Sequence, residues 1–176
     1  SNSGSLYFGV DTDGTTDYFD GKIDEVQIYN YARTSQQVVE DMNAGHPTPG
    51  SPVGSALVHW SFDEGYGSTT YDSGTNGNDG SLAVGDSSPS WTLNGKFEKA
   101  LNYDGNDDYV DMGDILDLGD SDNQTISGWF YRDTASSDDT ILAKRDGIAA
   151  GDTGYIVYID DANDTLIYEI SDGTDE

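Results

Sequence analysis

Short runs of alternating apolar and polar residues recur along this chain, and stretches rich in Gly, Asp, Asn and Ser separate them. Successive side chains of a β-strand point to opposite faces of the sheet, so these runs predict strands. The alternation is regular in residues 154–160, where Tyr155, Val157 and Ile159 share one face. Nine strands are predicted in this way: 6–10, 22–30, 56–62, 96–103, 108–112, 124–132, 140–145, 154–160 and 165–171.

Residues 35–43 form the one good helix candidate. Thr34 or Ser35 can cap the start of a short helix, and Gly45 can end it. Strands and helices do not alternate along the chain, which argues against a parallel sheet. The pattern therefore predicts an all-β, antiparallel sandwich or barrel with one short helix near residues 35–43.

The chain is strongly acidic, with 34 Asp and Glu against 7 Lys and Arg and a formal net charge of −27. Phosphate groups bind clustered basic side chains, so neither nucleic acid nor an anionic membrane surface is expected as a partner. Two interpretations of the acidity remain: divalent cation binding through carboxylate oxygens, and solubility in salty surroundings.

Other features of the composition narrow the class of protein further. Cysteine is absent, so neither a disulfide framework nor a thiolate metal site is available. The apolar runs are too short to span a bilayer, so we expect no membrane insertion. Residues 46–55 hold three of the four prolines and are predicted to be a linker between residues 1–45 and residues 56–176.

Four segments carry recognisable motifs: FDGKIDEVQIYNYARTSQQVVEDM at 19–42, HWSFDEGYGSTTYDSGTNGNDGSL at 59–82, GKFEKALNYDGNDDYVDM at 95–112 and TISGWFYR at 125–132. The first resembles the closing strand and following helix of laminin-G-like modules of the concanavalin A-like lectin/glucanase class, although Thr34 stands where that family often has Leu. The others resemble the first strands of the same module. The resemblance implies an antiparallel jelly-roll β-sandwich.

The order of these motifs is unusual, because the closing motif precedes the opening ones. The simplest explanation is a tandem array, in which residues 1–45 end one module and residues 56–176 begin a second. By resemblance, the second module lacks a central hairpin that should follow residues 165–171. The alternative is a circular permutation, in which residues 1–45 fold back onto residues 56–176. If the pieces meet in one sandwich, within or between chains, residues 22–30 should pair with residues 56–62.

Calcium is the expected cofactor, because Ca²⁺ takes carboxylate, amide and carbonyl oxygens. Asp72 and Asn76 lie in a Gly-rich loop that offers such oxygens, and Asp24 resembles a metal-binding carboxylate of related jelly rolls. Glu64 and Asp104 complete the predicted ligand set. The alternatives are ordinary turn chemistry for Asp72 and Asn76, and a capped strand end for Asp24.

Exposed aromatic side chains are the candidates for carbohydrate binding: Trp91 in the Ser-Pro-Ser-Trp loop, with Tyr66 and Tyr71. Trp60 and Trp129 lie inside predicted strands and are expected in the core. No pair of carboxylates typical of a jelly-roll glucanase and no Gly-x-Ser-x-Gly motif is present, so the chain is not expected to be an enzyme.

The first functional hypothesis is a non-catalytic carbohydrate-binding or adhesion module, stabilised by calcium and located outside the cell or at its surface. A second is a structural repeat of a surface fibre or filament, assembled by strand pairing between modules or chains. A third is an accessory module of a polysaccharide-degrading enzyme. The expected partners are accordingly glycans or neighbouring copies of the same protein.

Overall fold

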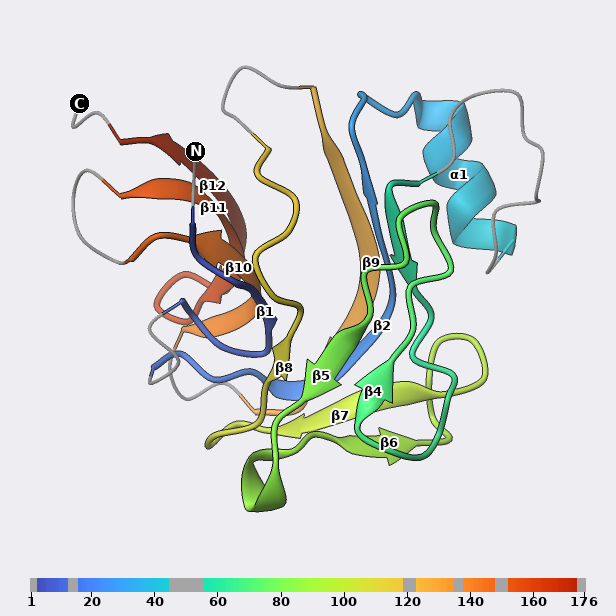
Figure 1. The fold of residues 1–176 in the computed structure, drawn as a ribbon, viewed down its shortest axis with the longest axis vertical. Helices are drawn as coiled ribbons and strands as arrows, with labels where there is room; N and C mark the ends of the chain where they lie inside the picture. The colour runs from blue at the N-terminus through green and yellow to red at the C-terminus, as the bar shows by residue number, and fades with distance from the viewer. Residues whose placement is uncertain are drawn as a thin grey trace.

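The computed structural model describes residues 3–12, 16–44, 56–118, 123–134, 138–147 and 152–173. The strands of these residues form two antiparallel sheets, and one short α-helix accompanies them (Figure 1). The predicted all-β sandwich is therefore confirmed. The predicted linker at residues 46–55, and Gly45 before it, lie outside the described residues. No described helix has both the length and the hydropathy that a membrane crossing requires.

The larger sheet has seven strands in the order β12-β11-β10-β1-β8-β5-β4. Their bounds are β12 (Thr165–Asp172), β11 (Thr153–Asp160), β10 (Asp139–Arg145), β1 (Leu6–Phe8), β8 (Val110–Asp111), β5 (Gly80–Leu82) and β4 (Thr69–Thr70). β1, from the start of the chain, therefore lies between two strands that follow the linker. β12 forms one end of this sheet.

The second sheet has five strands, and β2 is its centre. Their bounds are β3 (Val58–Trp60), β2 (Asp20–Tyr29), β7 (Ala100–Asp104), β6 (Ser90–Thr92) and β9 (Thr125–Arg132). β9 pairs with β2 over residues 21–29 of β2. β3 and β7 therefore share the opposite edge of β2. β9 is therefore an outer strand of its sheet, as β12 is of the larger one.

All nine predicted strands are present, but three short strands and a turn of 3-10 helix were not predicted. β4, β5 and β6 have only two or three residues each, and the 3-10 helix η1 (Gly85–Ser87) has three. β1, β3 and β8 are as short but lie within longer predicted runs, whereas no run of alternating residues was recognised around β4, β5 and β6. Tertiary pairing with longer neighbours is what makes them strands.

The predicted pairing of residues 22–30 with residues 56–62 is confirmed within one chain. Val26 lies opposite Trp60, and Ile28 lies opposite Val58, in an antiparallel ladder between β2 and β3. The segments on the two sides of the linker thus share one sandwich. The assignment of residues 1–45 and 56–176 to two successive modules, the second lacking a hairpin, stays a prediction.

One apolar core lies between the sheets, and aromatic side chains dominate it. Phe8 packs edge-on against Trp60 and Phe62, with ring centroids 5.4 and 5.8 Å apart, and all three side chains are fully buried. Trp60 is therefore a core residue, as predicted. The same expectation is wrong for Trp129, which is half-buried on the outer face of the second sheet.

Helix α1 (Ser35–Ala44) confirms the predicted helix, and Thr34 caps it. The Thr34 Oγ1 accepts a hydrogen bond from the Gln37 backbone N–H at 3.3 Å, and the Gln37 side-chain oxygen accepts one from the Thr34 N–H at 2.8 Å. This reciprocal pair satisfies two donors at the helix start. A salt bridge from Arg33, which precedes the helix, to Asp41 ties the incoming chain to the second turn.

Candidate functional site

Asp72 uses both of its carboxylate oxygens to shape the Gly-rich loop in which it was predicted to bind metal. Its Oδ1 accepts hydrogen bonds from the backbone N–H groups of His59 at 2.9 Å and Gly74 at 2.6 Å. Its Oδ2 accepts one from the N–H of Asn78 at 2.9 Å. Asn76 is exposed in the same loop. These contacts are those of the turn chemistry considered as the alternative for Asp72.

A different group of carboxylates lies close enough together to hold a metal ion. Oxygens of Asp104, Asp107 and Asp108 all lie within 4.8 Å of one another, and no other trio of acidic or histidine side chains in the described ranges does so. Asp104 belongs to the predicted ligand set. The other predicted acids, Asp24, Glu64 and Asp72, are not part of this trio. Burial and then the Asp104 and Asp107 charges raise the pKa of Asp108 to about 6. This trio can hold a metal ion.

The predicted sugar-binding aromatics gather around one loop. Tyr66 and Tyr71 are 81% and 60% exposed, and the Trp91 indole N–H donates to the Gly67 carbonyl at 3.0 Å. Glu64 holds the loop, since its Oε1 accepts a hydrogen bond from the Tyr71 N–H at 2.7 Å. Its buried Oε2 has no hydrogen-bond partner among the described residues. Sugar binding by this loop stays a prediction.

His59 sits in a fully connected network rather than in an open site. Its Nε2 lies 2.8 Å from Glu25 Oε2, and its Nδ1 lies 3.0 Å from Ser73 Oγ. The Ser73 hydroxyl also lies within hydrogen-bond distance of the His59 carbonyl oxygen, at 3.1 Å. Glu25 has a positive φ of 53° beside a bulge in β2, which lets two successive acids be buried there. The network joins β2, β3 and the Gly-rich loop.

A hollow of about 470 Å³ lies on the outer face of the five-stranded sheet, between β2, β9 and the loop before β7. Trp129 and Tyr131 alternate with the core-facing residues of β9 and therefore point to this outer face. The Lys96 ammonium lies 4.1 Å from the Trp129 ring centroid, and Lys22 lies 4.6 Å from that of Tyr131. Two of the chain's seven basic residues thus meet two aromatic rings here.

Asp24 lines the same hollow and is 3% exposed. Its Oδ2 accepts hydrogen bonds from the backbone N–H groups of Lys96 at 2.6 Å and Phe97 at 3.1 Å, while Oδ1 has no partner among the described residues. Gly95 allows this approach, because a Cβ there would lie 2.9 Å from Asp24 Oδ2. Burial raises the pKa of Asp24 to about 6, although the hydrogen bonds from the two backbone N–H donors act to lower it.

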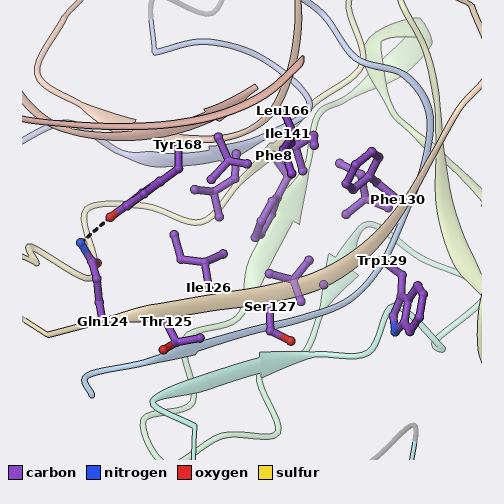
Figure 2. A pocket seen from close by; sticks show the side chains of 15 residues that line it. Phe8, Gln124, Thr125, Ile126, Ser127, Trp129, Phe130, Ile141, Leu166 and Tyr168 are labelled. Atoms are coloured by element: carbon purple, nitrogen blue, oxygen red, sulfur yellow. Dashed lines mark hydrogen bonds between the residues drawn. The ribbon is translucent and has the colours of Figure 1, made fainter. Parts of the chain in front are cut away.

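A second opening lies between the two sheets, where β9 and β12 face each other. It is a groove of about 430 Å³. Figure 2 shows Ile126 and Phe130 of β9 on one side and Leu166 and Tyr168 of β12 on the other. The Gln124 amide donates to the Tyr168 hydroxyl at 2.5 Å and bridges the two walls. Fifteen residues line the groove, and none of them carries a charge.

Neither opening was predicted, although parts of both could be recognised in the sequence. The alternation of residues 125–132 places Trp129 and Tyr131 on one face and Ile126 and Phe130 on the other. The lysines that meet the aromatic rings come from β2 and from the loop before β7, which are far from β9 in sequence. Only the pairing of these strands brings them together.

Residues 1–39 match the family model described as the concanavalin A-like lectin/glucanases superfamily, of the laminin-G type. The resemblance is therefore confirmed over that part of the chain. No curated protein and no solved structure matches the chain.

Proposed function

We propose that this chain is a non-catalytic, extracellular glycan-binding or adhesion module, and that the hollow beside Trp129 receives the sugar. The observation that carries the proposal is the convergence there of two aromatic rings and two lysines. Aromatic faces stack on the apolar face of a sugar ring, and polar side chains around them bind its hydroxyl groups.

The two lysines should make this site prefer acidic glycans to neutral ones. An ammonium over an exposed ring is held by about 0.5–1 kcal/mol, so a sugar can displace it at small cost. Once displaced, Lys96 remains within reach of the ligand, and so does Lys22, whose ammonium also lies 3.2 Å from an Asp133 carboxylate oxygen in the same hollow. Acidic glycans should therefore bind more tightly than neutral ones of the same size, because the two ammonium groups can pair with their charges.

A glycan array followed by calorimetry tests the proposal. Trp129→Ala should abolish binding, whereas Tyr66→Ala should leave it unchanged, and both variants should keep the far-UV spectrum of the parent. The reverse result would move the site to the loop of Tyr66, Tyr71 and Trp91. An array without any bound glycan at low and high salt contradicts glycan binding altogether.

Calcium is the metal that we propose for Asp104, Asp107 and Asp108. Carboxylate oxygens are the ligands that Ca²⁺ prefers, and a cation among them would relieve the mutual repulsion that contributes to the raised pKa of Asp108. Ca²⁺ at about 100 times its Kd should stabilise the fold by about 2.7 kcal/mol. Asp107→Asn should reduce this gain, and Glu40→Gln, which removes one exposed charge from α1, should not. Equal melting temperatures in Ca²⁺ and in chelator would argue against the site.

The absence of catalysis is also part of the proposal. Ser73, His59 and Glu25 are connected in the order of a hydrolytic triad, but the Ser73 hydroxyl is also placed to donate to the His59 carbonyl. We therefore expect a structural role. A serine-directed fluorophosphonate should fail to label the protein, and labelling that disappears in Ser73→Ala would overturn this view.

A further inference from the structure

β9 and β12 are outer strands of their sheets and lie on the same side of the molecule. The groove between the sheets is open on this side. Among the described residues, β12 pairs with β11 alone, and β9 pairs with β2 alone. Their outer edges therefore carry backbone N–H and C=O groups without strand partners. Such an edge is a template for another strand.

β12 has few of the features that normally protect an edge, since Glu169 and Asp172 are the only charged residues within it. Its ladder with β11 runs without a bulge from Thr165 opposite Asp160 to Asp172 opposite Thr153. The strand contains no proline and no lysine. Leu166, Tyr168 and Ile170 alternate along it and are 54%, 48% and 36% exposed. A long, regular and apolar edge of this kind favours pairing with another chain.

The charge around this edge also differs from that of the whole molecule. The formal net charge is −27, yet no charged residue lines the groove below β12. The groove reaches core residues, among them Phe8, Ile23 and Val26. Contact with this surface therefore removes apolar area from water without desolvating a charge.

We propose that β12 pairs antiparallel with β12 of a second copy of this chain, across a two-fold axis at Tyr168. This register places Leu166 opposite the partner's Ile170, and the two Tyr168 side chains opposite each other. Paired side chains in adjacent strands point to the same face, so the partner's apolar residues face the groove side of the sheet. The strand is thus complementary to itself.

The register also explains why a second copy fits better than an unrelated acidic strand. Glu169 lies opposite the partner's Ile167, so no two acids meet in the middle of the pair. Asp172 lies opposite the partner's Asp164 at each end, where salt screens the repulsion. The dimer should therefore strengthen as the salt concentration rises, because the apolar centre favours pairing and the charged ends and net charge oppose it. This inference does not depend on glycan binding.

Single cysteines test the register, since the chain has no cysteine of its own. Opposed residues in an antiparallel pair have Cα atoms about 4.5–5.5 Å apart, which suits a disulfide. Tyr168→Cys on the axis should cross-link rapidly under mild oxidation. Leu166→Cys and Ile170→Cys should cross-link only when both are present. Tyr71→Cys, at an exposed tyrosine outside β12 (60% against 48% for Tyr168), is the matched control and should stay uncrosslinked.

Sedimentation of the unmodified chain completes the test, from low salt to about 1 M NaCl, where screening is nearly complete. A dimer whose association constant rises at least tenfold over this range, together with the Tyr168→Cys cross-link, supports the proposal. A monomer at the highest protein and salt concentrations overturns it. A dimer in which Tyr168→Cys cross-links no faster than Tyr71→Cys also overturns it, because another surface then forms the contact.

Discussion

The sandwich has a closed side, around β2, and an open side, at the edges of β9 and β12. The strands of the two sides bury very different fractions of their residues. On the closed side, every residue of β2 from Ile23 to Tyr29 is buried, because β3, β7 and β9 pair with it and the other sheet covers it. On the open side, β12 has no buried residue, although four of its eight residues are apolar against four of ten in β2. Strand neighbours on both edges, rather than the sequence of a strand, decide how much apolar surface it buries.

The largest difference between the two sides should appear when an aromatic residue of the closed core is removed. Trp60→Ala should lower the free energy of unfolding by about 3–5 kcal/mol, because the cavity cannot be filled by the packed rings around it. Urea unfolding followed by circular dichroism measures this. A loss below about 1 kcal/mol would show that the closed side is no better packed than the open side.

A buried carboxyl on the closed side should make stability depend on pH. The pKa of Asp24 lies at about 6 in the folded chain against an ordinary value of 3.8, so between these pH values the folded state holds a proton that the unfolded state has lost. The free energy of unfolding should fall as the pH rises through this window, by at most about 1.4 kcal/mol per pH unit, and then level off.

Asp24→Asn isolates this contribution from the other acids. The variant should show a shallower slope between about pH 4 and pH 6 and should be more stable than the parent at pH 7. Asp133→Asn, which removes an exposed carboxylate near the same hollow, is the control and should keep the slope of the parent. An unchanged slope in Asp24→Asn would show that the carboxyl is not protonated in the fold.

The helix cap beside the closed side should have an intermediate effect. Thr34→Ala removes the acceptor for the Gln37 N–H and should cost about 1 kcal/mol. Thr34→Ser keeps the hydroxyl acceptor and should therefore retain most of the stability that Thr34→Ala loses. Thermal melting of the three proteins compares them directly, and equal melting temperatures would mean that α1 contributes nothing to global stability.

The smallest effect is expected on the open side. Leu166→Ala should change the unfolding free energy of the monomer by less than about 0.5 kcal/mol, since the side chain is 54% exposed. The same substitution should weaken the dimer measurably at high salt. Dilute and concentrated samples separate the two effects, and a large loss of stability in the dilute monomer would contradict the description of this edge as open.

Much of the fold could be predicted from local patterns. All nine strands with clear alternation are present, and the helix begins after the cap at Thr34 as its residues indicate. The three missed strands have two or three residues each and, unlike the equally short β1, β3 and β8, do not lie within a recognised run of alternating residues. Trp60 and Trp129 look alike in the sequence, since each lies inside an apolar strand, yet one is in the core and the other is not.

The candidate sites could be predicted only in part. Asp104 was recognised as a potential ligand, but its neighbours Asp107 and Asp108 were not, although they lie within four residues of it. Asp24 was singled out by resemblance, and its place beside Trp129 and Lys96 depends on the pairing of β2 with β9. Contacts between distant segments leave no local pattern.

The amino-acid sequence by itself determined the class of the fold, the positions of the long strands and of the helix, and the acidity of the surface. These properties follow from side-chain periodicity, capping and charge, which act over a few residues. Only the tertiary structure decided that residues before and after the linker share one sandwich, and that no described strand pairs with the outer edges of β9 and β12. Those features depend on which strands become neighbours, and this is set by the burial of the whole core at once.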